Sequence, residues 1–164
     1  CLRLVGSEMC IRDSYYNEWK FKHPLPNDFR RIAERISGIQ LQWYLTDWTQ
    51  TTNKIDYAIT GVENKGEGSK INLLRNQLMP MPLELLVVLK NGESELHYIP
   101  ISLMRGEKAN PYPIKWVVHP DWAWAHLEYS FLIDHPKEEI QTIIIDPSGL
   151  MADVDKSNNY YASE

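Results

Sequence analysis

Leu25-Pro-Asn-Asp-Phe-Arg-Arg-Ile-Ala-Glu-Arg-Ile-Ser-Gly-Ile-Gln-Leu-Gln-Trp-Tyr-Leu-Thr-Asp-Trp48 is the stretch that decides the fold. Its apolar residues recur twice at the spacing of one helix face, as Phe29, Ile32, Ala33 and Ile36 and then as Leu41, Tyr44, Leu45 and Trp48. Gly38 lies between the two sets, where a helix end favours the positive φ that glycine adopts without steric cost. We therefore expect a helical hairpin with two apolar faces. Those faces need a cover, either from the residues that follow or from a preceding part of the protein.

The composition is that of an ordinary globular protein. A chain of 164 residues is long enough for one domain, or for one domain with an attached piece. The net charge of −5 and the lack of a basic patch argue against a nucleic-acid partner. No apolar run reaches the roughly 20 residues that span a bilayer, so we expect no membrane span.

Residues 1–14 do not share the pattern of the rest. They show no periodicity and no helix cap, and they contain both cysteines of the chain, Cys1 and Cys10. The string resembles a translated sequencing adapter of the kind joined to reading frames assembled from environmental DNA. We expect an artefactual leader, which would mean that the natural protein began further upstream. The alternative is a genuine disordered N-terminus.

After residue 54 the pattern changes from helix to strand. Strands are predicted at 55–60, 71–77, 83–90, 95–101, 115–118, 127–133 and 140–145, with a short edge at 150–154. Asn91-Gly92 predicts a tight hairpin, because a type I′ turn needs positive φ twice. The expected class is α+β: the N-terminal helical hairpin, then a small antiparallel β-sandwich of immunoglobulin or fibronectin type at 55–157, then a polar tail at 158–164.

The sequence contains no recognised catalytic motif. None of the five histidines, His23, His97, His119, His126 and His135, is paired at helical spacing as a zinc helix requires, so we expect them to be structural or exposed. The tail matches the ligand spacing of a calcium loop at Asp153, Asp155, Ser157, Asn159 and Glu164, but no helix follows it. We therefore favour a polar tail over a calcium site.

Three tryptophans offer a binding surface. Trp116, Trp122 and Trp124 lie close together in the sequence and predict either a stacking surface for a sugar or peptide or a plug at the end of the sandwich. The first reading makes the chain a stand-alone β-sandwich binding module.

Several strings resemble aminopeptidase-N-like zinc metallopeptidases (gluzincins). Pro26-x-Asp28-Phe29, Glu34-x-x-Ser37-Gly38, Leu41-x-Trp43-Tyr44 and Trp48 resemble the end of the catalytic domain in that family, where the chain turns from helix into β structure. The C-terminal β domain of a bacterial branch is resembled by residues 55–59, Met79-Pro80-Met81-Pro82, Tyr98-Ile99-Pro100, Met104-Arg105-Gly106 and 145–153. The resemblance covers nearly all of the chain after residue 14.

The resemblance implies a non-catalytic role for this chain. Members of the family remove residues from peptide N-termini with a zinc ion held by a His-Glu-x-x-His helix. That helix belongs upstream of this stretch, so no catalytic or metal residue is assigned here and the chain alone is expected to be inactive. Residues 15–54 would be the terminal helices of the catalytic domain, and residues 55–157 the domain that braces it and borders the substrate cleft.

The implied partners are the N-terminal and catalytic domains of the same polypeptide, with peptide substrates bound by the parent enzyme. The side chains expected to pack onto the catalytic domain are Phe29, Ile32, Ile36, Leu41, Tyr44 and Trp48. The family also favours a periplasmic or secreted location over a cytoplasmic one. One departure concerns Leu25, which stands where a serine or threonine helix cap is expected.

Overall fold

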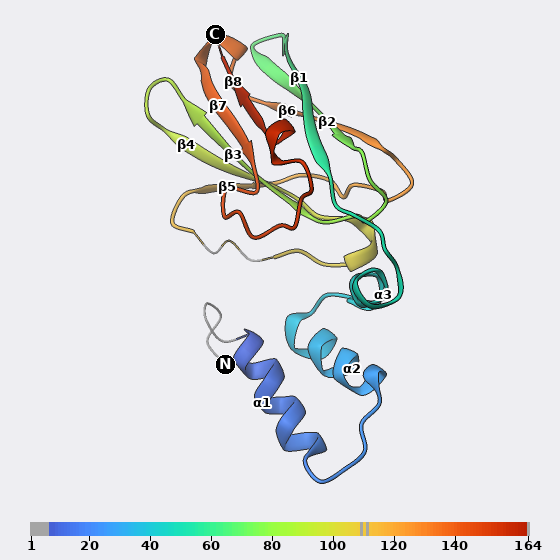
Figure 1. Cartoon of the computed structure of the whole chain (residues 1–164). Helices are drawn as coiled ribbons and strands as arrows, with labels where there is room; N and C mark the ends of the chain where they lie inside the picture. The colour runs from blue at the N-terminus through green and yellow to red at the C-terminus, as the bar shows by residue number, and fades with distance from the viewer. Residues whose placement is uncertain (1–6, 109, 111, 164) are drawn as a thin grey trace. The chain divides into compact units, whose positions relative to one another are not determined.

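The computed structural model describes residues 7–108, 110 and 112–163 (Figure 1). These residues fall into two compact units, a helical unit that includes residues 103–108 and a β unit. Three helices belong to the first: α1 (Ser7–Trp19), α2 (Pro26–Ser37) and α3 (Gln42–Gln50). No helix in the described part of the chain is long and apolar enough to cross a membrane.

The helical hairpin is confirmed at α2 and α3, with the ends that local sequence predicts. Pro26 opens α2 and Gly38 closes it with a φ of 75°, its N–H donating to the carbonyl of Glu34. Leu25 has no side-chain oxygen to cap the helix. Instead, the Asp28 carboxylate accepts the Leu25 N–H at 2.8 Å, so the start of the helix is still satisfied.

Residues 7–14 form the first turns of α1, so the alternative of a disordered N-terminus is wrong for these residues, whereas the artefactual leader stays a prediction. Residues 1–6 lie outside the described residues. The last turns of α1 are held against α2 by the edge-to-face rings of Tyr15 and Phe29, 5.4 Å apart, and by the ion pair of Glu18 and Arg35 at 2.7 Å. A docked helix needs no apolar stripe along its whole length, because tertiary contacts supply most of its stability.

The described residues of the β unit form two sheets and two short 3₁₀ turns. Its elements are β1 (Tyr57–Lys65), β2 (Gly68–Arg75), β3 (Leu83–Leu89), β4 (Ser94–Ile99), β5 (Lys115–Val118), β6 (Glu128–Ile133), η2 (Lys137–Glu139), β7 (Ile140–Ile145), η3 (Lys156–Asn158) and β8 (Tyr160–Ala162). A further 3₁₀ turn, η1 (Ser102–Met104), begins at the last residue of the β unit before the chain enters residues 103–108 of the helical unit. The sheet orders are β1-β2-β6 and β5-β4-β3-β7-β8. All pairs are antiparallel except β4 and β5, which run parallel, so the expectation of an antiparallel domain needs that one correction.

Alternating side chains of both sheets form the core of the β unit. On β3 the buried residues are Leu83, Leu85, Val87 and Leu89, and on β6 they are Phe131 and Ile133. The Phe131 ring lies 5.6 Å from the ring of His97 on β4, so these strands of the two sheets meet across the core. The α+β class is thus confirmed, whereas the immunoglobulin- or fibronectin-like sandwich stays a prediction.

The C-terminal segment is more ordered than its polarity suggests. Residues 150–154 form no strand beyond a single bridge between Asp153 and Ile55, and residues 160–162, predicted as a polar tail, form β8 on the edge of the larger sheet. Two buried polar side chains lie in this segment, Asp153 and Asn159. The Asp153 carboxylate accepts the Tyr57 N–H at 3.0 Å, and the Asn159 carbonyl accepts the Ile145 N–H at 2.9 Å. Hydrogen bonds therefore hold a strand that hydrophobicity alone does not reveal.

The close approach of β2 and β6 can be tested by a substitution at Gly68, where β2 begins. A methyl group on Gly68 would overlap the carbonyl oxygen of Ile133, which is backbone and cannot move aside. We expect Gly68→Ala to lower the free energy of unfolding by about 3 kcal/mol, measured by urea unfolding. The control is Gly66→Ala in the same turn, where φ is 66° and the added methyl meets open space, so about 1 kcal/mol of backbone strain is expected. Equal losses in the two variants would contradict the close packing.

Candidate functional site

The most unusual electrostatic feature of the β unit is a group that we call the Glu95 cluster: Glu95, His97, Lys115, His119 and His135. Glu95 is only 8% exposed. Its carboxylate lies 2.5 Å from the Lys115 ammonium, 3.1 Å from Nε2 of His135 and 3.5 Å from Nε2 of His97. Nδ1 of His97 in turn lies 2.9 Å from Nε2 of His119. Three histidines, one carboxylate and one ammonium thus form a connected chain.

Sheet pairing brings these residues together from distant parts of the sequence. Glu95 and His97 lie two residues apart on β4, which places both on one face of the strand. In the parallel β4–β5 pair Glu95 lies opposite Lys115. His119 follows β5, and its N–H donates to the carbonyl of Tyr98 at 2.9 Å. His135 follows β6, and its carbonyl accepts a hydrogen bond from the Ser69 hydroxyl.

The environment fixes the charge states. Burial raises the pKa of Glu95, but hydrogen bonds from Lys115 and His135 outweigh it and hold that pKa below its usual value. The same hydrogen bond raises the pKa of Lys115. Burial and the neighbouring His119 lower the pKa of His97 to about 4, and burial lowers the pKa of His119. At neutral pH the cluster therefore holds an ionised Glu95, a charged Lys115 and a neutral His97.

One tautomer of His97 suits both of its polar neighbours, although Nε2 is buried without a hydrogen-bond partner among the described residues. With the proton on Nε2, that N–H faces the Glu95 carboxylate, and Nδ1 accepts a hydrogen bond from Nε2–H of His119. The His97 ring is also packed 5.6 Å from the ring of Phe131. His97 is therefore a buried connector between the carboxylate and His119.

The Glu95 cluster does not fit a zinc ion. Its nitrogen and oxygen atoms hydrogen-bond one another instead of converging on one point, and within residues 7–108, 110 and 112–163 no three His, Cys, Asp or Glu side chains are placed to hold a metal. The arrangement ties β4, β5 and the segment after β6 into one unit through charge and hydrogen bonds. Sequence reasoning missed the grouping, although the spacing of Glu95 and His97 on one strand face was a signal for it.

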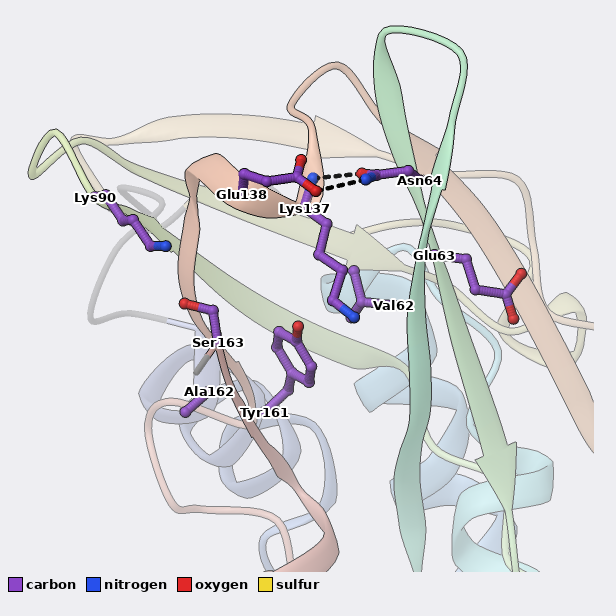
Figure 2. A pocket seen from close by; sticks show the side chains of 9 residues that line it. All are labelled: Val62, Glu63, Asn64, Lys90, Lys137, Glu138, Tyr161, Ala162 and Ser163. Atoms are coloured by element: carbon purple, nitrogen blue, oxygen red, sulfur yellow. Dashed lines mark hydrogen bonds between the residues drawn. The ribbon is translucent and has the colours of Figure 1, made fainter.

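A second feature is a polar groove of about 780 Å³ between the edge strands β1 and β8. It is lined by Val62, Glu63, Asn64, Lys90, Lys137, Glu138, Tyr161, Ala162 and Ser163 (Figure 2). Asn64 fixes one end of it: its side-chain N–H donates to the Glu138 carboxylate and its side-chain oxygen accepts the Lys137 N–H, both at 2.7 Å. No residue of this groove was a predicted site residue, because its walls come from four separate segments.

The structure separates the three predicted tryptophans. Trp122 is 2% exposed and packs its ring against Tyr57 and Tyr129, so the prediction of a binding surface is wrong for this residue. Trp116 is half-buried and stacks on Tyr98 at 5.1 Å. Only Trp124, 57% exposed, presents much of its ring. Trp122 instead plugs the core, and its ring N–H donates to the carbonyl of His126.

The side chains predicted to pack onto a catalytic domain differ in exposure. Phe29 and Trp48 are 39% and 48% exposed. Ile36, Leu41 and Tyr44 are half-buried, and the Tyr44 and Trp48 rings lie 6.0 Å apart. Ile32 is 2% exposed, so the prediction is corrected there: this side chain is already covered.

The oxygen atoms of the calcium-like pattern serve the backbone instead. Asp153 accepts N–H groups from Tyr57 and Asp155, and Asp155 accepts from the N–H and hydroxyl of Ser157. Glu164, the last position of the pattern, lies outside the described residues. The pattern therefore marks a hydrogen-bonded turn.

Comparisons with known proteins identify no family for this chain. No protein-family model matches the chain, and searches of curated proteins and of solved structures return no match.

His97 predicts a pH dependence of stability. Its folded-state pKa of about 4 lies below the 6.5 of a free histidine, so the unfolded chain binds more protons between these values and stability falls as the pH drops from 6.5 to 4. We expect His97→Gln to remove on the order of 3 kcal/mol of this loss, measured by urea unfolding at a series of pH values. His126→Gln, at an exposed histidine, should keep the parent profile. Parallel curves for His97→Gln and the parent would refute the assignment.

The tryptophans predict a contrast in stability. Because Trp122 is buried against two tyrosine rings, Trp122→Ala should lower the free energy of unfolding by about 4 kcal/mol. Trp124→Ala should cost less than about 1 kcal/mol, since that ring is exposed. Thermal unfolding followed by circular dichroism measures both, and similar losses would contradict the core role of Trp122.

Proposed function

We propose that this chain is the non-catalytic C-terminal part of an aminopeptidase-N-like zinc metallopeptidase, whose parent hydrolyses peptide bonds at peptide N-termini. The observation that carries the proposal is that two separate strings of the resemblance, Glu34–Tyr44 and Met104–Gly106, are in contact within the helical unit. The residues that make the resemblance are therefore the residues that hold one structural joint together.

The first string builds the turn between α2 and α3. The Ser37 hydroxyl donates to the Ala33 carbonyl at 2.7 Å, and Gly38 takes the left-handed conformation that ends α2. The Glu34 side chain then reaches across the turn to accept the Leu41 N–H at 2.9 Å. Three residues of the string, Glu34, Ser37 and Gly38, therefore make the contacts that shape this turn.

The second string packs on that turn. The Met104 carbonyl accepts the Gln40 N–H at 2.7 Å, and the Met104 side chain is buried. A Cβ on Gly106 would lie 3.0 Å from Cγ2 of Ile39 and 3.2 Å from the Gly38 carbonyl oxygen. Glycine at this position therefore permits the close approach of the two segments.

The strings in the β unit also correspond to specific contacts. The Tyr57 hydroxyl donates to the Met81 carbonyl and accepts the Met81 N–H, which fixes the proline-flanked segment before β3. The Asp146 carboxylate accepts the Met151 N–H and the Ser148 hydroxyl, which shapes the turn after β7. These contacts support assigning the β unit to the C-terminal domain of the same family.

The proposed role is mechanical. In the parent, zinc supplies Lewis-acid chemistry in the catalytic domain; in this chain, the exposed apolar side chains of Phe29 and Trp48 would be covered by that domain. The β unit would brace it and border the substrate cleft, in a periplasmic or secreted enzyme. A stand-alone binding module built on the three tryptophans is less favoured, because Trp122 is buried.

The apolar helical surface provides the test. We expect the chain to bind the dye ANS with strong fluorescence, and the double variant Phe29→Ser/Trp48→Ser to lose most of that signal, because those two side chains expose the largest apolar area on α2 and α3. The matched control is Leu132→Ser on β6, where the leucine is 55% exposed and the signal should persist. Dye fluorescence no higher than that of an ordinary folded monomer would refute the surface.

The enzymatic assignment is tested separately. The purified chain should neither bind stoichiometric zinc nor release p-nitroaniline from an aminoacyl anilide, and the reading frame upstream of residue 15 should encode His-Glu-x-x-His. Zinc-dependent hydrolysis by the chain alone would overturn the proposal.

A further inference from the structure

The groove between β1 and β8 has N–H and O–H donors on its wall, from the side chains of Lys90, Lys137, Tyr161 and Ser163. Figure 2 shows Lys90 reaching toward Ser163 and Lys137 extending toward Tyr161, so that two ammonium groups and two hydroxyl groups surround the same hollow. The Lys137 ammonium lies 6.0 Å from the centre of the Tyr161 ring. Among the described residues neither ammonium forms an ion pair, and both act electrostatically on the Glu138 carboxylate at the rim, so their remaining hydrogen-bond donors can face a ligand.

The groove has two acidic side chains, Glu63 and Glu138, and only Glu138 contributes its charge to the hollow. Glu63 points away from the hollow in Figure 2 and accepts a hydrogen bond from Asn72 on β2. The hydrogen bond from Asn64 to Glu138 lowers the pKa of that carboxyl, so Glu138 contributes one negative charge at the rim. Two lysines against one glutamate leave the groove with a positive balance.

The edge of β8 adds a backbone donor. The Ile145 N–H donates to the Asn159 carbonyl and the Ser163 N–H donates to the Gln141 carbonyl, so the polar groups of residues 159, 161 and 163 face β7. In an antiparallel pair these directions alternate along the strand, so the N–H of Ala162 faces away from β7. Ala162 lines the groove, and its N–H is therefore directed to that side.

We propose that this groove binds a small organic phosphate monoester. A phosphate monoester carries a charge close to −2 and three acceptor oxygens, which match two ammonium groups and several O–H and N–H donors. The groove, at about 780 Å³, is far larger than a bare phosphate group, and the Tyr161 ring with Val62 and Ala162 offers an apolar wall for the organic part. This site is independent of the proposed peptidase role.

The test is a titration of the ¹⁵N-labelled chain with phenyl phosphate at about pH 7.5, where the ester is mostly dianionic. Ionic strength is held constant with sodium chloride. We expect saturable shifts of the amide signals of Lys137, Ala162 and Ser163. We expect Lys90→Ala and Lys137→Ala each to raise Kd about fivefold, as for partly exposed charge interactions.

The matched control is Lys65→Ala, which removes the same charge from the β1–β2 hairpin outside the groove and should change Kd less than about twofold. Phenol should give no saturable shifts, and inorganic phosphate should bind more weakly than phenyl phosphate. Absence of saturable shifts with either phosphate would overturn the site, as would a Lys65→Ala effect as large as that of Lys137→Ala. Equal affinity for the two phosphates would overturn the assignment of an organic ester.

Discussion

The buried face of β3 is the constraint on which the β unit depends. Its four aliphatic side chains, Leu83 to Leu89 at alternate positions, are all at most 2% exposed. β3 pairs with β4 through a local hairpin and with β7, which lies far along the chain. A shift of either partner by one residue would turn an apolar set toward water, so the register of the larger sheet follows from this one face. Residues Phe131 and Ile133 of β6 complete the burial from the smaller sheet.

The buried carboxylates of Glu95 and Asp153 are tolerated within this apolar setting because each is compensated. A buried carboxylate is costly unless charge and hydrogen bonds replace its water. Lys115 and His135 do this for Glu95, while backbone N–H groups of Tyr57 and Asp155 do it for Asp153. Both devices join segments distant in sequence. They specify which segments meet, whereas the aliphatic core supplies most of the driving force.

The three features differ in what they can do. The Glu95 cluster is held together by contacts among its own members, so we interpret it as structural, and its signature is a dependence of stability on pH. The α2–α3 joint presents Phe29 and Trp48 outward, which suits a surface made to be covered. The β1–β8 groove is open and rich in donors, which suits a soluble anionic ligand. Two of the three features are therefore exposed. The helical surface suits contact with another protein domain, and the groove suits binding of a small molecule.

The sequence by itself determined the features whose causes are local. Pro26, Asp28 and Gly38 set the ends of α2. The β3–β4 hairpin lies where Asn91-Gly92 predicts it, but the predicted type I′ turn is wrong, because φ is positive at Gly92 (90°) and not at Asn91. Tertiary structure alone decided that residues 7–14 are helical, that residues 160–162 form a strand, and that Trp122 is buried while Trp124 is exposed. It also assembled the Glu95 cluster and the groove from strands far apart in the chain. These features arise when strands pair and helices pack against one another. A local sequence pattern does not show which distant segment a strand or helix will contact.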